Sequence, residues 1–210
     1  MTKLYLVRHG ETDWNKQNRC QGCIDIDLNE DGILQAKAVS KRLASEKIDM
    51  IYSSELTRAY HTADIINEQL SCEIKKDKAL NEIDFGDWEG LTFEEMRVRP
   101  DYNYLHWKSE PHKAAFPGEG SLQIVQDRAM KLIRQIIQEH SGKNILVVSH
   151  GGILKTVILG LLDIGLEAYN KFYITNTSIS IVSVEQERNY IHVLNDTCHL
   201  QDMIKTKPIF

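Results

Sequence analysis

Two histidines in this sequence stand in the same local setting, each directly after a short apolar run. His9 follows the run from Lys3 to Val7 and Arg8, and His150 follows the run from Asn144 to Val148 and Ser149. Such runs predict buried strands, and ligands in an open α/β sheet bind beyond the carboxyl ends of the strands. Each histidine is followed by glycine, which lets the backbone approach a ligand closely. We therefore expect both histidines at one ligand-binding edge of a sheet.

Two arginines are predicted to join them. Arg8 precedes His9, and Arg58 lies near the start of a predicted helix that follows a second strand, Asp49 to Ser53. Four such basic groups repel one another unless an anion neutralises them, and phosphate oxygens match the planar fork of arginine. The alternative without a functional role is that Arg58 forms an ion pair with Glu55 across one helical turn, which would stabilise the helix by ~0.3–0.5 kcal/mol.

A phosphate at this edge implies a particular chemistry. Phosphoryl transfer asks a protein mainly for positioning and charge neutralisation, and a histidine can act as the nucleophile. Arginine and histidine do the neutralising, so we expect neither a metal nor a cofactor. A general acid must protonate the leaving alcohol. The stretch from Leu80 to Gly90 mixes carboxylates with large apolar residues, and Glu82 is our first candidate, with Asp84 second.

The elements that must position these groups follow from the pattern of apolar residues. Two further strands, Ser178 to Val184 and Tyr190 to Leu194, are expected to form an antiparallel pair. Helical spacing of apolar residues predicts helices over Asp31 to Glu46, Glu55 to Leu70, Ser121 to His140 and Gly152 to Leu162. Strands that alternate with helices predict an α/β fold. We expect a three-layer α/β/α sandwich whose sheet is mostly parallel with an antiparallel edge strand.

One region stands apart from this alternation. Residues 97–120 are rich in Tyr, Trp, His and Pro and show no clear periodicity. Because long connections in compact domains are often lids or binding loops, we expect a single domain over residues 1–210 with a small cap insertion at about 97–120. Its basic residues form a solvated face or select an anionic part of the substrate: Arg97, Arg99, His106, Lys108, His112 and Lys113. Its aromatic residues Tyr102, Tyr104 and Trp107 are alternatives for stacking on a ring.

Composition and charge limit the possible partners. The chain has 210 residues and a formal net charge of −5, which disfavours nonspecific nucleic-acid binding but not binding of a small anion in a basic pocket. We see neither a secretory signal nor an apolar stretch of about 18 residues, so we expect a cytoplasmic protein without a membrane partner. Cys20 and Cys23 form a lone C-x-x-C, for which free thiols are the preferred interpretation.

Four motifs together resemble the histidine phosphatase superfamily, in its phosphoglycerate mutase-like branch. They occur in that family's order and spacing across about residues 3 to 195, and the opening motif alone is quite specific. The motifs are Leu6 to Asn15 (LVRHGETDWN), Ser53 to Ala59 (SSELTRA), Glu82 to Gly90 (EIDFGDWEG) and Ser149 to Gly152 (SHGG). The third motif resembles the broad-specificity and alpha-ribazole phosphatases more than the mutases, which usually carry Glu-Arg-His-Tyr-Gly there.

The resemblance implies roles for individual residues. His9 is implied to be the phosphorylated nucleophile and Glu82 the proton donor. The phosphate pocket is implied to comprise Arg8, Arg58 and His150 together with His9. Contacts to the phosphate or substrate are further implied for Asn15, Gln21, Gly22 and the backbone of Gly151. Many relatives read Gly-Glu-Ser before the long helix, whereas this chain has a glycine between Glu119 and Ser121, which leaves the contacts of Glu119 open.

We thus predict a phosphomonoester phosphatase that works through a covalent phosphohistidine on His9 and acts on a small-molecule phosphate ester. The first alternative is a cofactor-dependent phosphoglycerate mutase, which shares the first chemical step and differs in how well water is excluded. A second is a noncatalytic phospholigand-binding protein, disfavoured because nucleophile and acid are both present. Oligomeric state is left open, and a dimer is one alternative because a C-terminal hairpin supplies a sheet edge.

Overall fold

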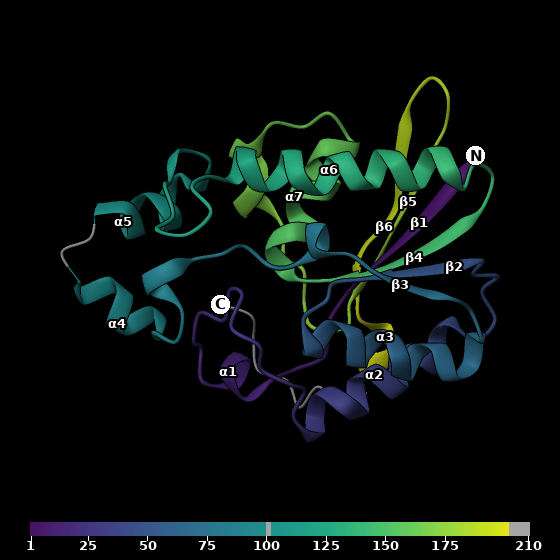
Figure 1. Ribbon diagram of the computed structural model, residues 1–210, viewed down its shortest axis with the longest axis horizontal. Coiled ribbons are helices and arrows are strands. Elements are labelled where there is room, and N and C mark those ends of the chain that lie inside the picture. Colours follow the sequence, from purple (N-terminus) through teal and green to yellow (C-terminus); the bar gives the residue numbers. More distant parts are fainter. Residues whose placement is uncertain (100–101, 202–210) are drawn as a thin grey trace.

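The computed structural model describes residues 1–99 and 102–201, which form one six-stranded sheet between two layers of helices (Figure 1). The order of strands across the sheet is β3-β2-β4-β1-β5-β6. Their bounds are β1 (Thr2–Arg8), β2 (Met50–Ser53), β3 (Ile74–Lys76), β4 (Asn144–Ser149), β5 (Ile179–Val184) and β6 (Asn189–Asp196). The predicted three-layer architecture is confirmed.

The central strands run parallel and end at the same edge. In β1 and β4, Arg8 lies opposite Ser149, and in β2 and β4, Ser53 lies opposite Val148. The residues that follow these three strands must therefore emerge close together. This register brings the two predicted histidines to one place.

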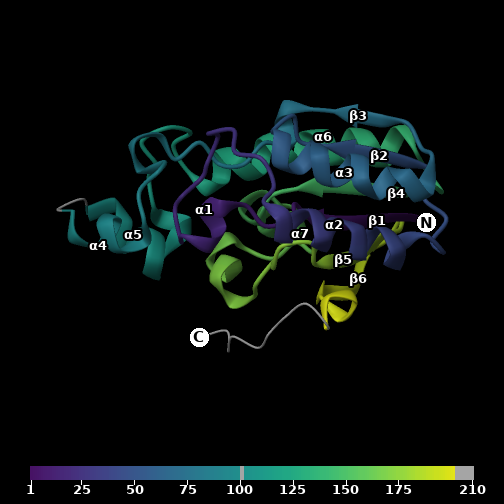
Figure 2. The same ribbon diagram turned by 90° about the horizontal axis from the view of Figure 1, so that it is seen from below.

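Each face of the sheet is covered by a pair of helices (Figures 1 and 2). Helices α2 (Glu30–Leu43) and α3 (Thr57–Leu70) cover one face, and α6 (Leu122–Glu139) and α7 (Gly151–Leu161) cover the other. Successive side chains of β1 belong in turn to the hydrophobic cores on the two faces of the sheet. Leu4 and Leu6 pack with α6 and α7, whereas Tyr5 and Val7 pack with α2 and α3. Side chains that alternate along a strand point to opposite faces, so a strand buried on both sides reads as the continuous apolar run seen in the sequence.

Three short helices gather at one end of the molecule in both views: α1 (Asp13–Lys16), α4 (Phe93–Val98) and α5 (Tyr102–Ser109) (Figures 1 and 2). A cluster of aromatic rings packs the segment that carries α5 onto the stretch that carries the predicted acid. Trp107 and Phe116 each meet Phe85 edge to face, with ring centroids 5.3 and 5.4 Å apart. The region 97–120, which shows no clear periodicity in the sequence, thus contains the helix α5. Its role as a cap stays a prediction.

The sheet differs from expectation in one detail. β3 was not predicted, because its three residues carry a single apolar side chain, Ile74, followed by two exposed lysines. β5 is antiparallel to β1, and the edge strand β6 is antiparallel to β5, so the predicted antiparallel pair at this edge of the sheet is confirmed. Within residues 1–99 and 102–201, no helix combines the length and the apolar character needed to cross a bilayer.

Candidate active site

The predicted basic residues converge beyond the carboxyl ends of β1, β2 and β4. The ring centroids of His9 and His150 lie 5.1 Å apart, and both rings are buried. Arg58, from the first turn of α3, is the largest fully buried side chain. His9 and Arg58 border a cavity of about 640 Å³, whose lining also includes Arg8 and Glu82.

His9 has one defined tautomer. Its Nδ1 lies 2.7 Å from the carbonyl oxygen of Gly10, and because a carbonyl only accepts, Nδ1 carries the hydrogen. Burial, reinforced by the charges of Arg58 and Arg8, lowers the pKa of His9 well below 6.5. The ring is therefore neutral near pH 7, with the free electron pair on Nε2, as a nucleophile requires.

His150 is held by a chain of side-chain hydrogen bonds. The Oδ1 atom of Asn81 accepts from the Ser54 hydroxyl over 2.8 Å and from the backbone N–H of Glu55. Ser54 Oγ therefore accepts the hydrogen of His150 Nε2, also over 2.8 Å. Burial and the Arg58 charge lower the pKa of His150 well below 6.5, and its buried Nδ1 has no hydrogen-bond partner among the described residues.

The two arginines are fixed by backbone carbonyls. Arg8 donates to Ile174 O over 2.7 Å, and Arg58 donates to Gly22 O and Ile24 O over 2.7 and 2.9 Å. Neither forms an ion pair with a carboxylate in the described part of the chain, so the pairing of Arg58 with Glu55 is wrong. Both Nε atoms are buried without a partner there. Buried cations that lack a directly paired anion are costly, and a phosphate between them lowers that cost.

Glu82 is held beside these cations by two backbone N–H groups. Its Oε1 accepts from Ile83 N over 3.0 Å, and its Oε2 accepts from Gly152 N, at the start of α7, over 3.1 Å. A side chain at position 152 would collide with this carboxyl group. The glycine after Gly151 thus lets the acid reach the helix N-terminus.

The remaining predicted contacts also line the cavity: Asn15, Gln21, Gly22 and Gly151. Thr12 connects two of them, because its hydroxyl donates to Gln21 Oε1 over 2.9 Å and accepts from Asn15 N. Of the nine predicted site residues, His150 alone is absent from the cavity lining, and its ring centroid lies 5.1 Å from that of His9. Gly22 adopts a φ of +53°, a conformation that glycine allows.

Several supporting residues were not predicted. Asn176, from the loop before β5, donates to the carbonyls of His9 and Gly10 and to Asn15 Oδ1, over 3.0 to 3.2 Å. Glu89 accepts from the backbone N–H groups of Cys23, Ile24 and Phe85. It therefore joins the loop after α1 to the stretch that carries Glu82. Glu89 lies within the motif Glu82 to Gly90, which does not by itself reveal these contacts, and Asn176 lies in none of the four motifs.

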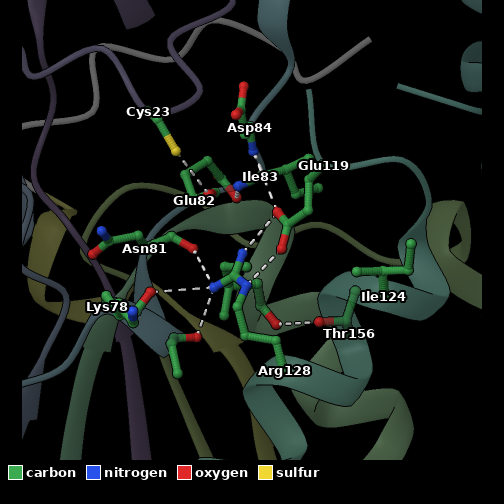
Figure 3. A network of polar contacts seen from close by, with 12 residues as sticks. Cys23, Lys78, Asn81, Glu82, Ile83, Asp84, Glu119, Ile124, Arg128 and Thr156 are labelled. Carbon is green, nitrogen blue, oxygen red and sulfur yellow. Dashed lines mark hydrogen bonds and ion pairs between the residues drawn. The ribbon is translucent and has the colours of Figure 1, made fainter. Parts of the chain in front are cut away.

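The stretch before Glu82 is held by Arg128 of α6 (Figure 3). Arg128 pairs with Glu119 through two hydrogen bonds, and its Nη1 donates to the carbonyls of Ala79 and Asn81 over 2.8 and 3.0 Å. Glu119 in turn donates its backbone N–H to Asp84 O over 2.9 Å. The pair thus contacts the chain on both sides of Glu82, which answers the open question about Glu119.

The residues of 97–120 divide between the two predicted roles, a solvated face and a contact with the substrate. Arg97, Tyr104, Trp107 and Lys108 line the cavity. Arg97 also pairs with Glu94 and Lys113 with Glu110, all on exposed side chains. The side chain of Tyr102 lies outside the described part of the structure. All four cysteines are free thiols, and burial raises the pKa of Cys23 to about 11.

The fold and this arrangement agree with comparisons to known proteins. The pattern that defines the histidine phosphatase superfamily (branch 1) matches residues 4–197. Phosphoserine phosphatase 1 of Hydrogenobacter thermophilus is 39% identical over 200 residues, covering 95% of each chain. This chain therefore belongs to the histidine phosphatase superfamily, and the resemblance stated from the motifs is confirmed.

Two solved structures show the same fold. Bacillus stearothermophilus YhfR superposes with a TM-score of 0.91 at 35% identity, covering 96% of this chain and all of that one. A variant of phosphoserine phosphatase from Entamoeba histolytica, in complex with phosphoserine, superposes with a TM-score of 0.87 at 36% identity, covering 95% and 100%. The prediction of an enzyme of the histidine phosphatase class, a group of hydrolases and mutases, is thereby confirmed.

Proposed function

We propose that this protein hydrolyses small phosphomonoesters, with Nε2 of His9 as the nucleophile and Glu82 as the general acid and base. The observation that carries the proposal is the neutral His9 ring, whose Nδ1–H is bound to Gly10 O while Nε2 stays free. Family membership supports the class of reaction. The roles of individual residues rest on the geometry of the site.

In the first step, His9 Nε2 attacks phosphorus and an N–P bond forms as the P–O bond to the leaving alcohol breaks. Glu82 gives its proton to the leaving oxygen. In the second step, Glu82 takes a proton from a water molecule while the oxygen of that water attacks phosphorus. The N–P bond breaks, and inorganic phosphate leaves with His9 restored.

The buried cations supply the charge balance for both steps. Arg8 and Arg58 are fixed by carbonyls before substrate arrives, so little reorganisation is needed when charge develops on the phosphoryl oxygens. Their unpartnered Nε–H groups are donors suited to that group, and the Nδ1 of His150, which carries a lone pair in the neutral ring, is suited only to a protonated phosphoryl oxygen. We assign Asn15, Gln21, Gly22 and Gly151 to the same phosphate and substrate contacts because they line the cavity. The basic side chains do the neutralising in this scheme, as the sequence predicted.

For the substrate we favour a phosphorylated hydroxy acid of the phosphoserine kind. Several of the similar proteins are named phosphoserine phosphatases, and one of the solved structures is in complex with phosphoserine. We further propose that residues 97–120 form a cap over the cavity, because Tyr104, Trp107 and Lys108 line it. A cytoplasmic location of the protein remains a prediction from sequence.

The test is release of phosphate from phosphoserine and p-nitrophenyl phosphate in EDTA, with wild type beside His9→Ala. We expect EDTA-resistant hydrolysis that is lost in His9→Ala and kept in His192→Ala, a matched change on an exposed histidine of β6. Full activity in His9→Ala would contradict the proposal. Transfer of phosphate between hydroxyls of phosphoglycerate, dependent on the bisphosphate, with no hydrolysis would favour the mutase alternative.

A further inference from the structure

Lys155 lies on α7 in line with the phosphate site. It follows Gly151 by four residues and Gly152 by three, so it shares their face of the helix, one turn further along. One turn of helix advances about 5.4 Å. Lys155 lines the same cavity as Arg8, His9 and Glu82.

The amine of Lys155 is surrounded by aromatic rings. Its Nζ lies 4.7 Å from the ring centroid of Tyr169, 5.9 Å from that of Tyr173 and 6.0 Å from that of Phe172. Such cation–π contacts hold the amine in place, and its three N–H donors form no hydrogen bond with the described part of the chain. Within residues 1–99 and 102–201, no carboxylate pairs with it.

The other cations around the cavity are engaged or solvated. Arg19 pairs with Glu95 and donates to Gly90 O, and Arg97 pairs with Glu94. Lys108 is exposed. Lys155 is half-buried, and this burial, with the Arg8 charge, lowers its pKa to about 8. An ammonium in that setting gains a great deal from an anionic ligand.

We propose that Lys155 binds a carboxylate on the leaving alcohol, so that the enzyme selects phosphomonoesters of small hydroxy acids. This inference rests on the proposed phosphatase function and adds the residue that reads the substrate. A single ammonium balances one negative charge, which suits a carboxylate. A second phosphate would bring close to two charges, and the neighbouring aromatic rings offer it no further cation.

The test compares phosphoserine with phosphoethanolamine, which differs from it only by lacking the carboxylate. The variants are Lys155→Met, which keeps the length of the side chain, and Lys155→Arg, which restores the charge. We expect wild type to prefer phosphoserine. Lys155→Met should lose about 10- to 100-fold in kcat/KM for phosphoserine, mainly through KM, because a hydrogen bond to a charged group is removed. Its activity on phosphoethanolamine should stay within a few-fold, and Lys155→Arg should recover part of the preference.

The controls separate this inference from the proposed function. Lys108→Met removes an exposed cation from the same cavity and should leave the preference unchanged. The role of Lys155 would be overturned if Lys155→Met lost the same factor in kcat/KM on phosphoserine and phosphoethanolamine. It would also be overturned if Lys108→Met reduced the preference for phosphoserine as much as Lys155→Met does. If wild type hydrolyses both substrates without any preference, the role of Lys155 is overturned while the proposed phosphatase function stands. If wild type hydrolyses neither these substrates nor p-nitrophenyl phosphate, the proposed function fails and the inference fails with it.

Discussion

Arg128 donates from Nε and Nη2 to the two carboxylate oxygens of Glu119, over 2.6 and 2.8 Å. The pair is mostly shielded, with side-chain exposures of 24% and 15%. Neither residue lines the cavity, yet together they hold Asn81 and Asp84, which flank the predicted acid (Figure 3). A planar fork with a fixed set of donors suits this task better than a flexible ammonium.

Removing this fork should loosen the position of Glu82. We expect Arg128→Met to lower kcat by at least tenfold with a smaller change in KM, and to reduce the free energy of unfolding by about 3 kcal/mol, because Glu119 then loses its partner. Steady-state kinetics and denaturant titration measure the two effects. Arg134→Met, an exposed arginine on the same helix, is the matched control. If Arg128→Met melts earlier but keeps its kcat, the pair is structural only.

The role of Glu82 as general acid can be separated from binding by changing the leaving group. Glu82→Gln should lower kcat for phosphoserine by roughly 10²–10⁴-fold, the usual contribution of a positioned acid. The loss should be much smaller in the first step with p-nitrophenyl phosphate, because p-nitrophenolate leaves without a proton. Burst kinetics with both substrates measure that step. Equal losses in the first step with both leaving groups would argue against proton donation by Glu82.

The lowered pKa of His9 has a direct spectroscopic consequence. Burial is its largest cause, followed by the charge of Arg58. The ring C–H signals of His9, assigned by their loss in His9→Ala, should keep the neutral chemical shift from pH 8 to below 6.5. Arg58→Met should raise this pKa toward its ordinary value. An inflection near pH 6.5 in the wild-type protein would contradict the neutral nucleophile.

Stability should also respond to the two buried histidines. Both pKa values are lowered in the folded state, so the unfolded chain binds more protons below its own pKa of about 6.5. Unfolding free energy therefore falls as pH falls below that value, by about 2.7 kcal/mol per pH unit from the pair. Denaturant titrations at several pH values should show a slope smaller by about 1.4 kcal/mol per unit in His150→Asn. An unchanged slope would mean that His150 is charged in the folded protein.

The sequence predicted which basic groups converge beyond the sheet because each directly follows an element with a strong pattern. His9 and His150 come after continuous apolar runs, and Arg58 opens an amphipathic helix after another. Parallel strands bring such positions together whatever the details of packing. Glu82 was selected by its mixed apolar and acidic surroundings and by the resemblance to the family.

The residues that position these groups could not be predicted in the same way. Asn176 reaches His9 O from 167 positions away in the chain, and Arg128 reaches Asn81 O from 47 positions away. Their partners are backbone atoms, which leave no mark in the sequence. Lys155 interrupts an apolar helix, and sequence alone does not reveal that aromatic rings from the loop after α7 surround it. The short strand β3 and the helix α5 within residues 97–120 depend on tertiary contacts in the same sense.

The central claim is a covalent phosphohistidine at Nε2 of His9, and trapping it is the most direct measurement. Glu82→Gln should be mixed with p-nitrophenyl phosphate and quenched in base, because its first step needs no acid and its second lacks a base. Mass spectrometry should find phosphate on the peptide that contains His9, stable in base and lost in acid, and phosphorus NMR should place it on Nε2. The label should be absent when His9→Ala is added. Turnover without this label, or a label on another residue, would contradict the account.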